Sequence, residues 1–236
     1  MPSPRVAEKQ AARRDHILDH AASIVLEDGL DALTMERLAQ ALGVATSALY
    51  RTFSGRAALL AGLQVRAIAA LAAEVDAALT AAPRGGTPAV RALGRVLAAL
   101  RPFAFAPERG AAWLPLVDAF LSAPEATLDD AALAEVEAVL APLLARVTEA
   151  IEAAAQAGAL APGDAAVRTR VAWATLHGLH HLRRRDRVEP PARRSAVVVA
   201  AALDGLFLGW GAKPRAWAAA RARAEGRARA ARGRAA

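Results

Sequence analysis

Side chains suited to contact with a polyanion are concentrated between Thr34 and Arg56. Small residues such as Thr46 and Ser47 let a helix approach the edges of DNA bases, and a phenol such as that of Tyr50 can hold a phosphate oxygen. An arginine beside the free amides of a helix N-terminus, as expected for Arg56, forms a phosphate site. The residues predicted to bind DNA are Thr34, Ala45, Thr46, Ser47, Tyr50, Arg51 and Arg56.

Two short helices are predicted to position these residues. Apolar residues recur at helical spacing from Thr34 to Leu42, and the Thr34 hydroxyl can cap this helix by accepting a bond from a first-turn amide. Gly43 then supplies the left-handed conformation that turns the chain. A second short helix is predicted over residues 45–53, with Ala48 turned inward. Two short helices joined by a tight glycine turn form a helix-turn-helix, whose second helix can enter a major groove.

The stretch from residue 10 to residue 62 resembles the DNA-binding domain of the tetracycline-repressor (TetR) family. Many positions agree with the family pattern at fixed spacing, which makes the resemblance specific. The agreeing positions are Thr34, Ala39, Leu42-Gly43-Val44, Leu49-Tyr50, Phe53, Arg56 and Leu59-Leu60. The resemblance implies a DNA-binding head followed by a helical ligand-binding and dimerisation domain.

The chain is therefore predicted to be all-α and to have four parts. Residues 1–9 are expected to form a loose basic arm, which either lies along phosphates or is a disordered terminus. Residues 10–55 are the three-helix DNA-binding domain, and residues 56–212 are the helical effector-binding and dimerisation domain. Residues 213–236 form a basic Ala/Arg-rich tail, which either holds DNA without sequence preference or is a frayed, solvated extension.

Aromatic side chains make up only 4 % of the chain, yet they gather between residues 103 and 121. Pro102 is expected to end the helix before this segment, and two further prolines make the segment irregular. Clustered aromatics on irregular backbone can form the wall of an apolar ligand pocket, although they can also be ordinary core. The expected ligand is a small apolar or aromatic effector. The predicted pocket residues are Phe103, Phe105, Trp113, Leu116, Phe120, Trp173 and His177.

The two helices predicted over residues 164–183 and 192–211 are apolar around most of their circumference. Such helices must be buried on most sides, which suggests that a partner subunit covers them. The Trp173, His177 and Gly178 pattern resembles one branch of the TetR family, which implies a homodimer with a four-helix-bundle interface. The predicted interface residues are Trp173, Gly178, His181, Val198, Leu203 and Leu206.

The formal net charge of +7 does not by itself indicate DNA binding. Eight of the 30 basic residues and one of the 23 acidic residues lie from Lys213 onward, so that residues 1–212 are neutral overall. The prediction of DNA binding therefore rests on the motif and on local placement rather than on bulk charge.

No catalytic, cofactor or metal site is predicted. The chain has no cysteine, and it has neither a phosphate-binding loop nor a nucleophile elbow. His177 and His181 stand one helical turn apart, but no carboxylate at a recognisable spacing accompanies them, so they are expected to be core or interface residues. No uninterrupted apolar run reaches the ~18 residues of a membrane span. We therefore expect no membrane partner and a cytoplasmic location.

Together these patterns predict a ligand-responsive DNA-binding transcriptional regulator. It is expected to be a repressor that binds a near-palindromic double-stranded operator as a homodimer. The alternative is a helical scaffold or accessory protein whose head contacts protein rather than DNA.

Overall fold

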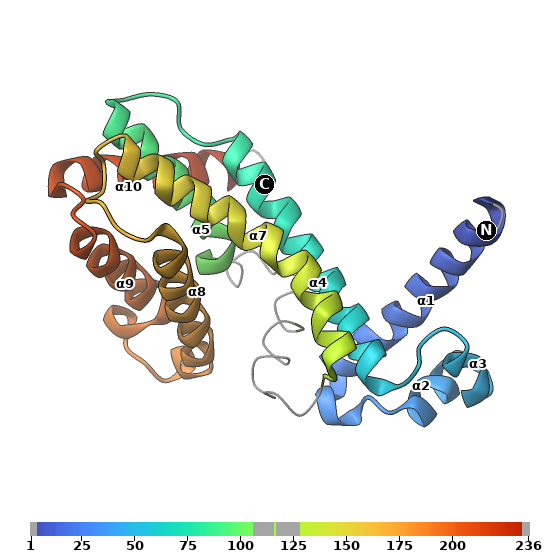
Figure 1. The fold of residues 1–236 in the computed structure, drawn as a ribbon. Coiled ribbons are helices and arrows are strands. Elements are labelled where there is room, and N and C mark those ends of the chain that lie inside the picture. The colour runs from blue at the N-terminus through green and yellow to red at the C-terminus, as the bar shows by residue number, and fades with distance from the viewer. Residues whose placement is uncertain (1–3, 106–115, 117–127, 233–236) are drawn as a thin grey trace. The chain divides into compact units, whose positions relative to one another are not determined.

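The computed structural model describes residues 4–105, 116 and 128–232, and these residues form helices and no strand (Figure 1). The predicted all-α class is thus confirmed. The elements are α1 (Pro4–Asp28), η1 (Leu30–Ala32), α2 (Met35–Leu42), α3 (Thr46–Tyr50), α4 (Arg56–Thr80), α5 (Pro88–Phe105), α7 (Asp130–Gln156), α8 (Ala165–Leu182), η3 (Arg183–Arg187), η4 (Pro191–Arg193), α9 (Ser195–Gly209) and α10 (Pro214–Arg232).

The chain divides into two compact units. The first unit comprises residues 1–70 and 112–140, and the second comprises residues 71–111 and 141–236. The long helices α4 and α7 contribute residues to both units.

The core of the first unit forms where α1 packs on η1 and α2, and Leu18 of α1 lies against α4 at Gly62. The inward stripe of α1 follows the 3.6-residue period, as the sequence predicts. It consists of Ile17, Leu18, Ala21, Ile24 and Val25, all of them buried. On the other helices, the side chains of Leu38, Leu49 and Leu60 are at most 1 % exposed. A small head of this size thus has one continuous apolar core.

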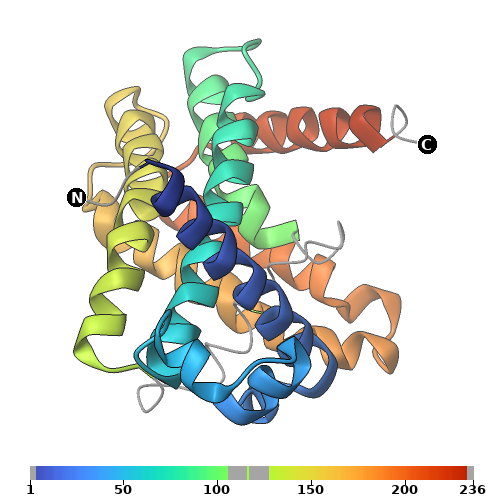
Figure 2. The same cartoon turned by 90° about the vertical axis from the view of Figure 1, so that its right-hand side faces the viewer.

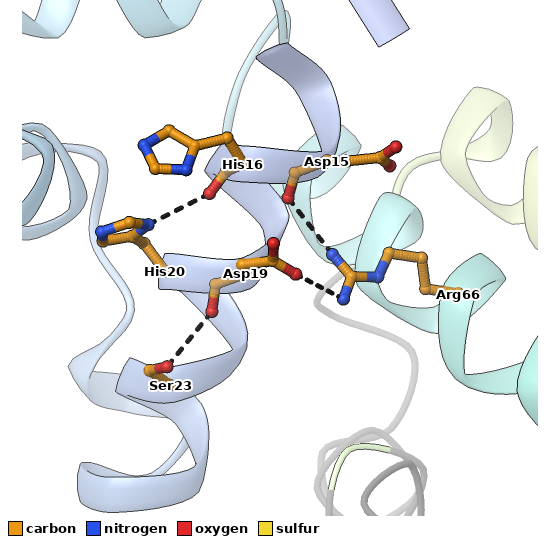
Figure 3. A network of polar contacts seen from close by, with 6 residues as sticks. All are labelled: Asp15, His16, Asp19, His20, Ser23 and Arg66. Carbon is orange, nitrogen blue, oxygen red and sulfur yellow. Dashed lines mark hydrogen bonds and ion pairs between the residues drawn. The ribbon is translucent and has the colours of Figure 1, made fainter. Parts of the chain in front are cut away.

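Arg66 of α4 ties that helix to α1 on the surface of the first unit (Figure 3). Its Nη1 donates to the Asp15 carbonyl oxygen at 3.3 Å, and its Nη2 donates to Asp19 Oδ1 at 2.7 Å. Because both side chains of the ion pair are exposed, this contact orients the helices more than it stabilises them.

From Pro4 onward the N-terminal arm is helical, which corrects the expectation of a loose segment for these residues. α1 begins at Pro4 and its first turns extend beyond the α2–α3 pair (Figure 1). Residues 5–14 consist almost entirely of Ala, Arg, Lys, Glu and Gln, which are strong helix formers. They therefore continue the helix that the core stabilises further along. Arg5 and Lys9 remain exposed on these turns.

The second unit is built around α5, which packs against both α8 and α10, while α9 packs against α8. Figure 2 shows α10, in red, beside α5, in green. Leu93, Val96 and Phe103 of α5 are buried, as are Leu176 of α8 and Phe207 of α9. α5 continues through Pro102 to Phe105, although Pro102 was expected to end this helix. Pro102 has no amide to donate to the carbonyl four residues earlier, so it removes one hydrogen bond of α5 without ending the helix.

Residues 214–232 of the Ala/Arg-rich tail form helix α10 of the second unit, which corrects the alternative of a frayed extension for these residues. Trp217 is only 3 % exposed and stacks on Phe207 with ring centroids 4.1 Å apart. Its Nε1 donates to Asp204 Oδ1 at 2.6 Å. Arg221 donates to both oxygens of the same carboxylate, and this hydrogen bonding raises the pKa of Arg221 above its usual value.

Helix α4 is long and apolar enough, by length and composition, to cross a membrane. Half of its most apolar window is buried within the protein, as in the core helix of a soluble domain. Gln64 and Arg66 interrupt its apolar sequence, which is why no uninterrupted run of that length exists.

We expect Asp204→Asn to loosen α10. The asparagine keeps an acceptor for Trp217 but loses the charge that Arg221 contacts. Because Arg221 and Asp204 are 31 % and 37 % exposed, solvent screening limits the loss in the free energy of unfolding to about 1 kcal/mol. Thermal unfolding and the rate of tryptic cleavage within α10 measure the effect.

The matched control is Glu225→Gln, which removes the other carboxylate that Arg221 contacts, at 3.5 Å and 57 % exposed. It should change both readouts by less than half as much. Equal effects from the two variants would show that Asp204 is not the anchor of α10.

Candidate nucleic-acid interface

The helix-turn-helix begins at the predicted cap. The Thr34 Oγ1 accepts a hydrogen bond from the Arg37 backbone amide at 3.1 Å, which satisfies a free donor of the first turn of α2. Glu36 follows in that turn, where its negative charge interacts favourably with the helix dipole. Thr34 thus fixes where α2 starts.

Gly43 ends α2 in the left-handed conformation, with φ 65° and ψ 31°. The backbone amide of Val44 then donates to the Ala39 carbonyl at 3.0 Å, which closes the end of the helix. A residue with a Cβ rarely adopts this conformation, so the turn requires glycine. The turn leads directly into α3.

Helix α3 presents polar side chains outward on an apolar base. Ala48 and Leu49 are 8 % and 1 % exposed, whereas Tyr50 is 51 % exposed. Ser47 and Arg51 are exposed as well. The outward set therefore contains a small hydroxyl that suits base edges and a phenol and a guanidinium that suit phosphates. Of the other predicted DNA-binding residues, Thr46 is half-buried, and Thr34 and Ala45 are exposed.

Two arginines of α1 hold α3 in place, and sequence reasoning did not assign them this role. Arg13 Nη2 donates to the Ala48 carbonyl oxygen at 3.2 Å. This carbonyl lies near the C-terminal end of α3, where a positive charge interacts favourably with the helix dipole. The guanidinium of Arg14 lies 4.5 Å from the centre of the Phe53 ring, a cation–π contact. The only sequence signal was the pair of adjacent arginines, which by itself does not reveal a partner.

A groove of about 560 Å³ lies beside α3. Its lining contains no acidic residue and carries three cations, so its potential favours an anion such as a phosphodiester. The lining residues are Gln10, Ala11, Arg13, Arg14, Arg51 and Thr52.

Arg56, predicted as a phosphate ligand, makes internal contacts. Its Nε donates to the Leu33 carbonyl oxygen at 2.9 Å, and its Nη2 donates to the Leu30 carbonyl oxygen at 3.0 Å. These bonds attach the start of α4 to the η1 segment that precedes α2. Arg56 thus orients the helix-turn-helix, and its contact with phosphate stays a prediction.

Three of the residues predicted to line a ligand pocket come together in the second unit. The rings of Phe103 and Trp173 meet edge to face with centroids 5.1 Å apart. Trp173 stacks on His177 at 4.5 Å, and the His177 side chain is buried. Leu116 is buried and belongs to the first unit. Trp113, Phe120 and the side chain of Phe105 lie outside the described residues.

The residues predicted to form the dimer interface differ in how exposed they are. Leu203 is 4 % exposed and packs inside its own unit, while Trp173, Val198 and Leu206 are half-buried. Gly178 is exposed, and the side chain of His181 lies outside the described residues.

Exposed apolar or small residues nevertheless form a stripe on each of α8 and α9. Their spacing of three or four residues places each set on one helical face. The α8 stripe is Val167, Val171, Ala174, Gly178 and Leu182, and the α9 stripe is Val197, Ala201, Gly205 and Leu208. The sequence could not locate these stripes because both helices are apolar on nearly every side.

The capped α2, the glycine turn and the outward polar face of α3 define a helix-turn-helix DNA-binding domain. Residues 17–63 match the family model described as bacterial regulatory proteins, tetR family. The predicted resemblance of the DNA-binding head to the TetR family of transcriptional regulators is thus confirmed, while the resemblance of the Trp173, His177 and Gly178 pattern to one branch of that family stays a prediction.

Solved structures with the same fold include the TetR family regulator PfmR from Thermus thermophilus, at 22 % identity and TM-score 0.55, covering 81 % of this chain and 97 % of that one. A tetR-family regulatory protein from Rhodococcus matches at 18 % identity and TM-score 0.59, covering 85 % and 97 %. AibR in complex with isovaleryl coenzyme A and operator DNA matches at 18 % identity and TM-score 0.56, covering 82 % and 97 %. No curated protein matches this chain.

We expect Gly43→Ala to destabilise the head by about 1 kcal/mol, because alanine is strained at a left-handed φ of 65°. Thermal unfolding followed by circular dichroism measures the loss. DNA affinity should fall with it, because the turn sets the direction of α3.

Gly55→Ala is the control, since Gly55 has no left-handed φ and a Cβ there would meet no atom within 4 Å. This variant should unfold like the wild type. If both alanines cost the same, the conformation of Gly43 is not what the turn depends on.

Proposed function

We propose that this chain is a cytoplasmic repressor that binds a near-palindromic operator as a homodimer and responds to a small apolar or aromatic effector. The observation that carries this proposal is the outward face of α3, where Ser47, Tyr50 and Arg51 are exposed above the buried Ala48 and Leu49. A rigid helix with this surface fits a major groove.

The outward residues have different tasks in this proposal. Ser47 contacts base edges and so contributes to sequence preference, while Tyr50 and Arg51 hold phosphates and so fix the register of the helix. The basic groove beside α3, with Arg13 and Arg51 in its lining, continues the phosphate-binding surface.

Homodimer formation is supported by the exposed stripes on α8 and α9. Val171 and Val197 are 41 % and 47 % exposed, and Gly178 and Gly205 have open space where a Cβ would be. Two helices from each subunit, with small residues that permit close approach, fit a four-helix bundle. A two-fold dimer would then place two α3 helices on two half-sites about 34–36 Å, or a multiple of this distance, apart.

An effector site at the Phe103–Trp173–His177 cluster is supported by its aromatic composition and burial. Stacked rings suit an apolar or aromatic ligand. An effector changes DNA binding only if it binds one conformation of the protein better than the other. One relative of similar fold, AibR, has been solved with both isovaleryl coenzyme A and operator DNA, which supports a combined effector and DNA response in this fold.

We expect Tyr50→Phe to weaken DNA binding about tenfold, because it removes one hydrogen bond to a charged phosphate. The affinity for the operator and for a duplex of scrambled sequence should fall by similar factors, since phosphate contacts carry no sequence information. Fluorescence anisotropy with both duplexes at one fixed salt concentration provides the measurement.

Ser47→Ala is the matched comparison from the same exposed face. It should reduce affinity for the operator while leaving the scrambled duplex nearly unaffected. Unchanged affinity in both variants would favour the rival scaffold function, in which the head contacts protein.

We expect Val171→Arg to convert the dimer into a monomer, because it places a charge in the middle of an apolar interface. Size-exclusion chromatography with light scattering measures the mass. Val188→Arg introduces the same charge at a residue that is 82 % exposed and lies off both stripes, and it should remain dimeric. A dimeric Val171→Arg protein would place the interface elsewhere.

A further inference from the structure

The second unit has a groove with a volume of about 680 Å³ at the loop between α4 and α5. Its floor is mostly apolar, and its charged lining residues are all arginines. The apolar lining residues are Leu79, Ala82, Pro83, Ala92 and Ala153, and the remaining lining residues are Thr80, Arg84, Arg91 and Arg95.

None of these arginines is neutralised by a carboxylate of the described residues. Arg91 Nη1 donates to the Gly86 carbonyl oxygen, and neither Arg84 nor Arg95 forms a hydrogen bond or ion pair with the described part of the chain. All three side chains are exposed.

An adjoining cleft shares Leu79, Thr80, Arg95 and Ala153 with the groove and contains two acidic residues. Asp76 is occupied by Arg146, whose Nε lies 2.6 Å from the Asp76 Oδ1. Of the acidic residues in that lining, only Glu149 forms no ion pair with Arg146. Its single negative charge is smaller than the combined positive charge of the three arginines in the groove.

Helix α10 adds positive charge and contacts the loop between α4 and α5 through two arginines. Arg227 donates to the Ala81 carbonyl oxygen. The Arg223 guanidinium lies against Gly86, where an added Cβ would come within 2.6 Å of its Nη1. Gly86 has φ 101°, so glycine permits both this backbone conformation and the close approach. The loop that carries Arg84 is therefore fixed without a ligand.

This arrangement favours an anion. Arg91 and Arg95 are four residues apart on α5, where like charges repel each other, and a bound anion would relieve the repulsion. A guanidinium binds a carboxylate or a phosphate through paired hydrogen bonds. The apolar floor gives such a ligand a second, non-polar contact.

We propose that this groove binds a small amphipathic organic anion, with one carboxylate or phosphate group held by Arg84, Arg91 and Arg95 and a short apolar part on the floor. The site is separate from the Phe103–Trp173–His177 cluster. It does not depend on the proposed role of the chain as a repressor.

The test uses the full-length protein and hexyl phosphate as the probe, with isothermal titration calorimetry at low ionic strength. We expect saturable binding of one molecule per chain. Arg95→Gln should weaken it at least tenfold, and Arg95→Lys should restore part of the affinity. Arg193→Gln, an exposed arginine of η4 away from the groove, should bind like the wild type. Hexanoate should bind at the same site, and hexanol should bind much more weakly.

Three results would overturn the proposal. Equal affinity of wild type and Arg95→Gln would place the probe elsewhere, and equal affinity for hexanol would remove the role of charge. If hexyl phosphate does not saturate while a random-sequence duplex loses affinity in Arg84→Gln and Arg95→Gln, the arginines form a general polyanion surface. Tyr50→Phe should bind hexyl phosphate normally, so a failure of the repressor proposal is recognised separately.

Discussion

The DNA-binding head depends on burying the inner side of a helix that is too short to be stable by itself. α3 spans five residues, whereas isolated helices below about 12 residues are marginal in water. Its conformation therefore comes from tertiary contacts: Leu49 and Phe53 in the core, and Arg13 and Arg14 of α1 against its end. Because these contacts fix α3, its outward side chains can reach DNA without a large ordering cost.

The arginines of this chain fall into two groups that composition cannot separate. Some donate to backbone or carboxylate groups within one unit, as Arg56 does to Leu33 and Arg221 does to Asp204. Others, such as Arg84 and Arg95, face solvent without a partner among the described residues. The first group positions elements and the second group is available to ligands. Both groups contribute equally to the net charge of +7, so the net charge cannot tell them apart.

Sequence reasoning succeeded where one residue type determines one local conformation. Thr34 as a cap and Gly43 as a left-handed turn are such cases, and both could be predicted. It failed for α10, because alanine contributes apolar surface too weakly to reveal that Trp217 packs on Phe207. It also could not find the outward stripes of α8 and α9, since a helix that is apolar on all sides has no periodic signal. Tertiary packing alone selects those faces.

Helix α8 links the two properties that the proposed regulator needs in its second unit. Trp173 and His177 stack together and Trp173 meets Phe103 of α5, while Val171 and Gly178 lie on the exposed stripe. A ligand that moved Trp173 would thus move the surface proposed to pair with a second subunit. By thermodynamic linkage, subunit pairing would then change the affinity for the ligand by the same factor. Interiors are closely packed, so α8 would transmit such a shift as a rigid element rather than absorb it.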